Sequence, residues 1–369
     1  MNLKDNKLVT YTAGAIALIA LPIFAQQFGS GPVRILDSAL LYVLLALGLN
    51  IVVGYAGLLD LGYIAFYALG SYLFALLASP QLLDTFPALR ATFPNGMHTH
   101  IWLAIPMAAG LAGFAGVLLG APTLKLRGDY LAIVTLGFGE IIRVFLLNLD
   151  APVNITNGPR GIGPIDSPRI PIPFTDFTFD FGQAHQLFGM NFPNVTNFYF
   201  LFLLLVLFSV LICHRLERSR IGRAWMAIRE DEIAAKAMGI NTRNMKLLAF
   251  GMGATFGGVS GTMFATFQGF VSPESYILNE SIIIVAMVVL GGIGHLPGVI
   301  VGALLLAMLP EVLRYVASPL QNLTGGRLDA SILRQLLIAL AMITIMLVNP
   351  RGLWPSKEHG KAAPTPAGK

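Results

Sequence analysis

Apolar segments of about 20 residues run through most of this chain, and they limit its fold more than any other feature. A helix of about 20 residues crosses the roughly 30 Å hydrocarbon core of a bilayer. Because a bilayer holds no water to pair with backbone amides, such segments fold as helices rather than as isolated strands. Charged residues make up only 12% of the chain, against about 25% in soluble domains. The sequence therefore predicts an all-α integral membrane protein.

We expect about ten transmembrane helices, two of them broken. The predicted spans are 8–28, 35–53, 57–78, 101–121, 130–148, 197–213, 247–270, 280–294, 297–316 and 332–349. Glycines and a proline interrupt the long apolar run at 291–297, and three glycines interrupt the segment 54–62. Non-helical backbone at membrane depth is tolerated only against protein or a water-filled cavity, and transporters often place substrate sites at such breaks. We therefore predict broken or half helices at both places.

The distribution of positive charge predicts the orientation. Most of the 24 Lys and Arg residues fall on one side of the predicted spans, and positively charged loops stay in the cytoplasm. Both termini and the loop 214–246 are then cytoplasmic, and the loop 149–197 is outside. We expect one permease domain at 1–355, a disordered cytoplasmic tail at 356–369, and no internal disulfide, since Cys213 is the only cysteine.

Small residues recur every four positions in three predicted spans. The series are Gly253, Gly257, Gly261, Ala265 and Gly269; Gly294, Gly298 and Gly302; and Ala112, Gly116 and Gly120. This spacing places each series on one helix face, where small side chains let backbones approach closely. The series predict tight helix packing, with a face along which a helix slides during gating as the alternative.

The loop 214–246 is densely charged within an otherwise apolar chain. Its sequence is HRLERSRIGRAWMAIREDEIAAKAMGINTRNMK. A turn between two spans needs no such length or charge, so the loop predicts a docking surface for a soluble partner. The net charge of +5 gathers on one side of the membrane and does not indicate nucleic-acid binding, so we expect membrane lipid and proteins as partners.

No residue pattern indicates catalysis. The chain lacks the glycine-rich phosphate loop of ATP-binding proteins, and His98 and His100 lack the spacing of a zinc site. We expect neither enzyme activity nor a metal or other cofactor in this chain.

Ionisable and polar residues inside the spans are candidates for function. Glu140 and Arg143 lie three residues apart on one helix face, and Glu311 and Arg314 repeat this arrangement. Such residues form ion pairs between helices or an outer gate, and the two glutamates are the deep carboxylates that we identify. Asn50 and Gln268 either join helices by hydrogen bonds or contact a substrate.

Within the charged loop, residues 233–239 fit the coupling motif of ABC-importer permeases, which is Glu-Ala-Ala, three residues and Gly. Ala234, Ala235 and Gly239 match, while Ile233 stands in place of the Glu and Glu232 precedes it. Further matching segments are ALGLNIVVGYAGLLDLGYIAFYALGSYLFALL (46–77), LRGDYLAIVTLGFGEIIRVFLLN (126–148), GRAWMAIREDEIAAKAMGI (222–240), QGFVSPES (268–275) and VVLGGIG (288–294). Over residues 35–352 the chain resembles the high-affinity branched-chain amino-acid ABC permeases, specifically their M subunits.

This resemblance implies an assembly in a bacterial inner membrane. Two homologous permeases form the channel, two cytoplasmic ATPases bind ATP and Mg, and a periplasmic binding protein delivers Leu, Ile or Val. The expected ATPase contacts are Arg229, Glu230, Glu232, Ala234, Ala235 and Gly239. From the breaks and the polar residues within the spans, we expect the path to be lined by Asn50, Gly54, Gly57, Gly62, Gln268, Gly291 and Gly292.

Three alternatives remain open from the sequence. An ion-coupled secondary transporter would need carboxylates at membrane depth and would leave the charged loop unexplained. A passive channel or scaffold has no need of that loop either. Within the ABC permeases, related members import urea, other amides or other amino acids, and the residues do not decide the substrate.

Overall fold

The computed structural model describes residues 17–93, 97–123, 128–171, 178–187 and 190–323, with isolated positions and short pieces outside these ranges. Most of the predicted last span, 332–349, the start of the first span, and the predicted tail, 356–369, lie outside the described residues.

Long apolar helices make up most of the described chain. They are α2 (Ser30–Asn50) with its extension η1 (Ile51–Tyr55), α3 (Ile64–Leu77), α6 (Ile101–Thr123), α7 (Asp129–Asn148), α8 (Asn194–Glu217), α11 (Thr242–Gln268), α12 (Leu278–Gly291) and α13 (Leu296–Leu323). Among described residues, six helices are long and apolar enough to cross a membrane, and three apolar helices are shorter. The all-α membrane fold is confirmed, while the span count of ten stays a prediction.

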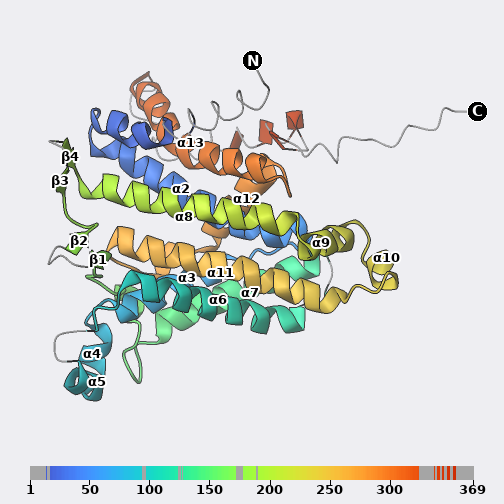
Figure 1. Cartoon of the computed structure of the whole chain (residues 1–369), viewed down its shortest axis with the longest axis horizontal. Coiled ribbons are helices and arrows are strands. Elements are labelled where there is room, and N and C mark those ends of the chain that lie inside the picture. Colours follow the sequence, from blue (N-terminus) through green and yellow to red (C-terminus); the bar gives the residue numbers. More distant parts are fainter. Residues whose placement is uncertain are drawn as a thin grey trace, which may run out of the picture.

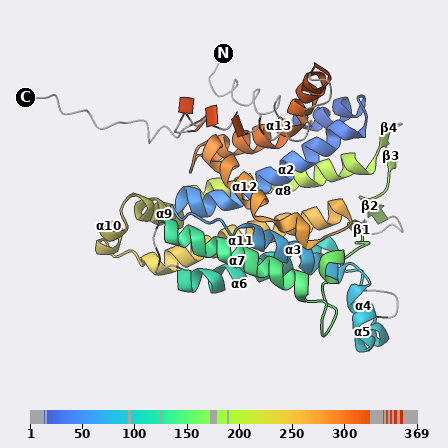
Figure 2. The ribbon, with the colours of Figure 1, turned by 180° about the vertical axis from the view of Figure 1, so that it is seen from behind.

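Helix α11 lies at the centre of the bundle, between α2 on one side and α3 and α6 on the other (Figure 1 and Figure 2). Its glycines face neighbouring backbones. A Cβ atom on Gly258 would lie 2.5 Å from the Ala108 carbonyl oxygen of α6, and one on Gly261 would overlap the Tyr67 carbonyl of α3. The predicted tight packing is therefore confirmed. Gly269 and Gly294, however, do not continue the helix face predicted for them. Gly269 follows the end of α11 with a left-handed φ of +68°, and Gly294 lies in the turn before α13 with a φ of +80°.

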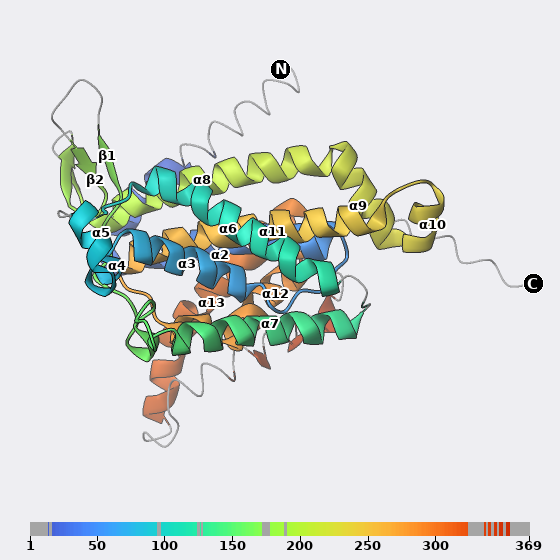
Figure 3. The same cartoon turned by 90° about the horizontal axis from the view of Figure 1, so that it is seen from below.

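Polar elements occupy the two opposite ends of the bundle (Figure 1 and Figure 3). One end, the hairpin end, carries α9 (Arg220–Glu230) and α10 (Glu232–Ala237). The other, the strand end, carries α4 (Gln81–Thr85), α5 (Pro87–Thr92), η2 (Gly158–Arg160), η3 (Pro273–Tyr276), β1 (Arg169–Pro171), β2 (Thr178–Asp180), β3 (His185–Leu187) and β4 (Met190–Phe192). Strand β1 pairs with β2 and β3 with β4, both antiparallel. The sequence did not predict these short strands in the loop 149–197.

Two helices are too short to cross a bilayer. Helices α3 and α12 each have 14 residues, which corresponds to about 21 Å against the roughly 30 Å of hydrocarbon. Residues 56–63, before α3, are not helical, and a turn at 292–295 separates α12 from α13. The two predicted breaks are confirmed.

Candidate functional site

The two breaks meet at the hairpin end of the bundle. The last turn of the α2 helix widens into the π-helix η1, a form that is frequent at functional sites. Gly57 then adopts a left-handed φ of +69° and turns the chain out of the helix, a conformation that glycine accepts without steric cost. Across the gap, the Asn50 Oδ1 atom accepts a hydrogen bond of 2.9 Å from the Gly294 backbone N–H. One side chain of α2 therefore fixes the other break.

Residues 60–62 of the first break are held further inside the bundle. The Leu61 N–H donates to Thr135 Oγ1 of α7 at 3.0 Å, and the Ser281 hydroxyl of α12 donates to the Leu61 carbonyl at 2.6 Å. The Gly62 N–H donates to Asp60 Oδ1 at 2.9 Å. Side chains from two helices thus replace the backbone partners that a continuous helix would have supplied.

The predicted path residues separate into two groups. Those at the breaks are Asn50, Gly54, Gly57, Gly62, Gly291 and Gly292, and all but Gly57 are buried. Gln268 lies instead at the strand end, exposed, where its Oε1 atom accepts a 3.3 Å hydrogen bond from Arg34. These residues do not form one continuous surface, and their role in lining a path stays a prediction.

The predicted ion pair on α7 is present. Arg143 Nε lies 2.9 Å from Glu140 Oε2, with the side chains 24% and 37% exposed. Glu311 lines a groove of about 720 Å³ between α2 and α13, together with Arg34. The Arg314 side chain lies outside the described residues, so the second pair is not tested.

The fully buried carboxylates are not the two that the sequence singled out. Asp37 on α2 is 0% exposed and Asp60 is 1% exposed, while Glu140 and Glu311 are only half-buried. Among the described residues, both Asp37 oxygens and Asp60 Oδ2 lack a hydrogen-bond partner. The sequence carried a signal that we missed, since Arg34 and Asp37 have the same spacing of three at the start of an apolar span.

The α9–α10 hairpin (residues 220–239, including the turn after α10) is anchored to the start of α11. The Trp225 side chain is 0% exposed, and its Nε1–H donates to the Met245 carbonyl at 2.7 Å. Lys246 Nζ lies 2.8 Å from Glu232 Oε1, with the Lys246 side chain only 8% exposed. Asp231 caps α10 by accepting hydrogen bonds from two backbone N–H groups, a strong N-cap arrangement. The hairpin is thus attached to the first turns of α11 by specific contacts.

The six predicted ATPase contacts point in two directions. Glu230, Ala234 and Gly239 are exposed at the surface of the hairpin. The other three turn toward the bundle: Ala235 is 4% exposed, Glu232 pairs with Lys246, and Arg229 Nη1 donates a 2.5 Å hydrogen bond to the Gly54 carbonyl. Sequence spacing could not separate these two groups, because it does not show where the hairpin lies against the bundle.

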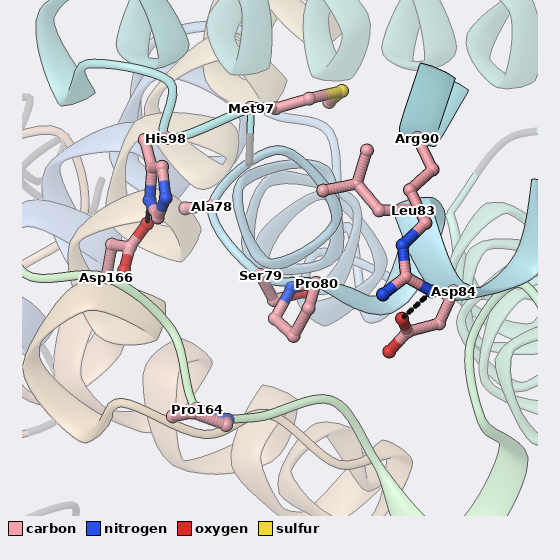
Figure 4. A pocket seen from close by; sticks show the side chains of 10 residues that line it. All are labelled: Ala78, Ser79, Pro80, Leu83, Asp84, Arg90, Met97, His98, Pro164 and Asp166. Carbon is pink, nitrogen blue, oxygen red and sulfur yellow. Dashed lines mark hydrogen bonds and ion pairs between the residues drawn. The ribbon is translucent and has the colours of Figure 1, made fainter. Parts of the chain in front are cut away.

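A pocket of about 310 Å³ opens at the strand end (Figure 4). His98 Nδ1 lies 2.6 Å from Asp166 Oδ2 on one side, and Arg90 lies 3.9 Å from Asp84 on the other. Both pairs are at least one-third exposed. The pocket can hold a small polar molecule or a partner side chain, but it has no connection through the described hydrogen bonds to either break.

Long apolar helices, two broken membrane segments and an anchored polar hairpin are the architecture of a multi-pass membrane transport protein. The chain belongs to the family described as the permease component of branched-chain amino acid transport systems, which it matches over residues 31–347.

Individual relatives agree with this family. The chain is 39% identical to the high-affinity branched-chain amino acid transport system permease protein LivM of Escherichia coli (strain K12), over 95% of this chain and 76% of that protein. It is 41% identical to LivM of Salmonella typhimurium over 92% of this chain and 73% of that protein. It is also 26% identical to the permease protein LivH of Salmonella typhimurium, over 72% of this chain and 80% of that protein. No solved structure matches the chain.

Proposed function

We propose that this chain is a permease subunit of an ATP-driven importer that moves leucine, isoleucine and valine into a bacterial cell across the inner membrane. A second, homologous permease completes the channel, and a periplasmic binding protein delivers the substrate. Two cytoplasmic ATPase subunits bind ATP and Mg and dock on the α9–α10 hairpin, so the hairpin end and both termini face the cytoplasm. Family membership and the strong similarity to LivM proteins support this assignment.

The observation that carries the proposal is the outer surface of the α9–α10 hairpin. Ile233 is 72% exposed and Met238 is 83% exposed, although the surrounding hairpin is charged. Gly239 has a left-handed φ of +85° and open space where a side chain would begin. Exposed apolar side chains beside small residues fit a groove in a partner protein. The apolar Ile233 therefore supplies packing area where the family motif has a glutamate.

A second permease of similar fold is supported by the relatives of this chain. Besides LivM proteins, it resembles permease proteins named LivH at 26% identity. Two related chains of this kind can pair about a pseudo-twofold axis, since twofold pairing is the commonest arrangement of equivalent subunits in soluble oligomers.

The substrate's chemistry fits a path with few charges. A branched-chain amino acid has an apolar side chain and a zwitterionic head, and the described membrane segments contain few ionisable groups. We propose that the binding protein sets most of the specificity and that the two breaks gate a largely apolar path.

Purification of the tagged chain from native membranes in mild detergent, followed by mass spectrometry, tests the assembly. Two ATPase subunits and a second permease should copurify, and the reconstituted complex should take up leucine only with ATP inside. Because Asp37 and Asp60 are buried carboxylates, a proton-coupled transporter is the alternative that the same assay tests. Recovery of the chain without an ATPase, or leucine uptake that a protonophore abolishes and ATP does not drive, would contradict the proposal.

Replacement of Gly239 by Trp tests the docking surface. The bulky ring would stand in the space that the ATPase is proposed to fill, so leucine uptake should be lost while the permease pair still assembles. Gly128→Trp is the matched control, because Gly128 also has a left-handed φ, +56°, and open space around it. Normal uptake by Gly239→Trp would remove the hairpin from the coupling route.

A further inference from the structure

Arg229 is the residue through which the α9–α10 hairpin reaches the membrane segments. It lies in the last turn of α9, yet its Nη1 atom donates a 2.5 Å hydrogen bond to the carbonyl of Gly54 in η1. The last carbonyls of a helix have no donor within the helix, and they carry partial negative charge. A guanidinium therefore suits this position, since it supplies both a donor and a positive charge.

The same side chain also contacts the second break. A Cβ atom on Gly294 would lie 2.6 Å from Arg229 Nη1, and one on Gly57 would lie 2.9 Å from its Cγ atom. Both glycines have left-handed φ angles, +80° and +69°. Arg229 thus fills the space that these two glycines leave open. Arg229 therefore contacts both breaks, at Gly57 of the first and at Gly294 of the second.

Arg229 lies between the two anchors of the hairpin and close to its exposed surface. Trp225, one turn before Arg229, is fully buried, and the Glu232–Lys246 ion pair follows three residues after it. The exposed residues of α10 begin four residues after Arg229, at Ile233. A short, anchored segment therefore connects the exposed surface of α10 to the Arg229 guanidinium.

We propose that Arg229 is a positioning residue that joins the α9–α10 hairpin to both broken membrane segments, residues 56–63 and 292–295, so that the two breaks move together when the hairpin moves. This inference rests on the proposed function, because it assigns a route for the force that the ATPase subunits apply. Arg229, which the sequence predicted as an ATPase contact, is then a connection between the hairpin and the two breaks.

The test uses the complete complex in proteoliposomes, with radiolabelled leucine uptake and ATP hydrolysis measured in parallel. Arg229→Met should still assemble and hydrolyse ATP, but the leucine moved per ATP should fall by about tenfold or more, as expected from the loss of a charge-assisted hydrogen bond. Arg229→Lys keeps the charge on a shorter side chain and should restore part of the ratio. Arg223→Met is the matched control, since Arg223 lies on the same helix and is exposed, and among the contacts described its side chain donates to the Arg218 carbonyl at the end of α8 rather than to either break.

Wild-type leucine-to-ATP ratios in Arg229→Met would overturn the role of Arg229, as would an equal loss in Arg223→Met. If Arg229→Met fails to assemble, Arg229→Lys decides the question, because a normal ratio with the shorter side chain contradicts the link. The experiment distinguishes a failure of the proposed function from a failure of the Arg229 link. Absence of ATP-driven leucine uptake in the wild-type complex would contradict the proposed function, whereas wild-type uptake with an unchanged variant ratio contradicts only the Arg229 link.

Discussion

The glycines of α11 and the two left-handed glycines of the breaks, Gly57 and Gly294, serve opposite purposes. In α11 they have helical backbones and sit directly against carbonyl groups of α3 and α6, so that three helices pack at close range. At the breaks, Gly57 and Gly294 have left-handed φ angles and lie beside an arginine side chain. Packed backbones have little freedom to rearrange, while a side chain on a flexible stem can move. The comparison indicates that α11 is the fixed frame and that the breaks are the moving parts.

The largest effect should come from filling the α11 contact. In Gly261→Val the new side chain overlaps the Tyr67 carbonyl of α3, and such overpacking should destabilise the fold by about 3 kcal/mol or more. We expect little folded protein by size-exclusion chromatography in detergent. Gly110→Val on α6 is the control, since Gly110 has open space around it. Wild-type yield and melting temperature in Gly261→Val would show that α11 is not a fixed frame.

Removal of the hairpin anchor should have the next largest effect, confined to the hairpin. Trp225→Ala empties a fully buried site, a change that costs about 3–5 kcal/mol in a protein core. Hydrogen exchange should rise in residues 220–240 and stay unchanged in the middle of α11. Trp225→Phe keeps most of the ring volume but loses the bond to Met245, so it should show a smaller rise. A rise spread through α11 would show that the frame depends on the hairpin and is not fixed by its own packing.

A methyl group at the second break should impair transport more than stability. Gly294→Ala places a Cβ 2.6 Å from Arg229 Nη1 at a φ of +80°, and the left-handed backbone alone costs about 1–2 kcal/mol. Melting temperature should fall slightly, and ATP-driven leucine uptake should fall strongly. In an Arg229→Ala background Gly294→Ala should lower the melting temperature less, because the collision with Arg229 is gone and only the 3.0 Å contact with the Gly54 carbonyl and the backbone strain remain. An equal fall in melting temperature in both backgrounds would show that the contact with Arg229 contributes nothing to the effect.

The smallest effect should come from acid at the strand end. Burial favours the neutral Asp180 carboxyl, but hydrogen bonds from Ser167 and the Gly182 N–H and the charge of Arg169 outweigh it and lower the pKa below its ordinary 3.8. A group with a lowered folded pKa stabilises the structure above its unfolded pKa and loses that contribution as pH falls through the folded value. Protection from hydrogen exchange in residues 178–187, corrected for the intrinsic exchange rate at each pH, should therefore fall below about pH 4. Asp180→Asn should show the faster exchange already at pH 7, and a pH response retained in Asp180→Asn would contradict this assignment.

The sequence predicted the helical frame well, because apolar length alone specifies a membrane helix. It placed α6 and α7 within two residues at each end. It placed the start of the third span at residue 57, whereas α3 begins at Ile64. Apolarity does not reveal that Leu61 bonds to side chains of α7 and α12, or that the Gly62 N–H donates to the Asp60 side chain.

The connections between segments far apart in the sequence could not be predicted. The pattern around Arg229 indicates a charged loop, and only the fold brings that side chain to Gly54, 175 residues earlier in the chain. Buried Asp37 was missed although its spacing from Arg34 was visible. The short strands of the loop 149–197 carry too few residues for an alternating pattern to stand out.

Hydrogen exchange on the assembled complex, with and without a non-hydrolysable ATP analogue, tests the division between frame and breaks most directly. ATP binding to the partner subunits should change exchange in peptides covering residues 51–63 and 291–297, and leave peptides from the middle of α11 unchanged. Arg229→Met should abolish the change at both breaks together. A nucleotide response centred on α11, or one that appears at a single break, would contradict the account.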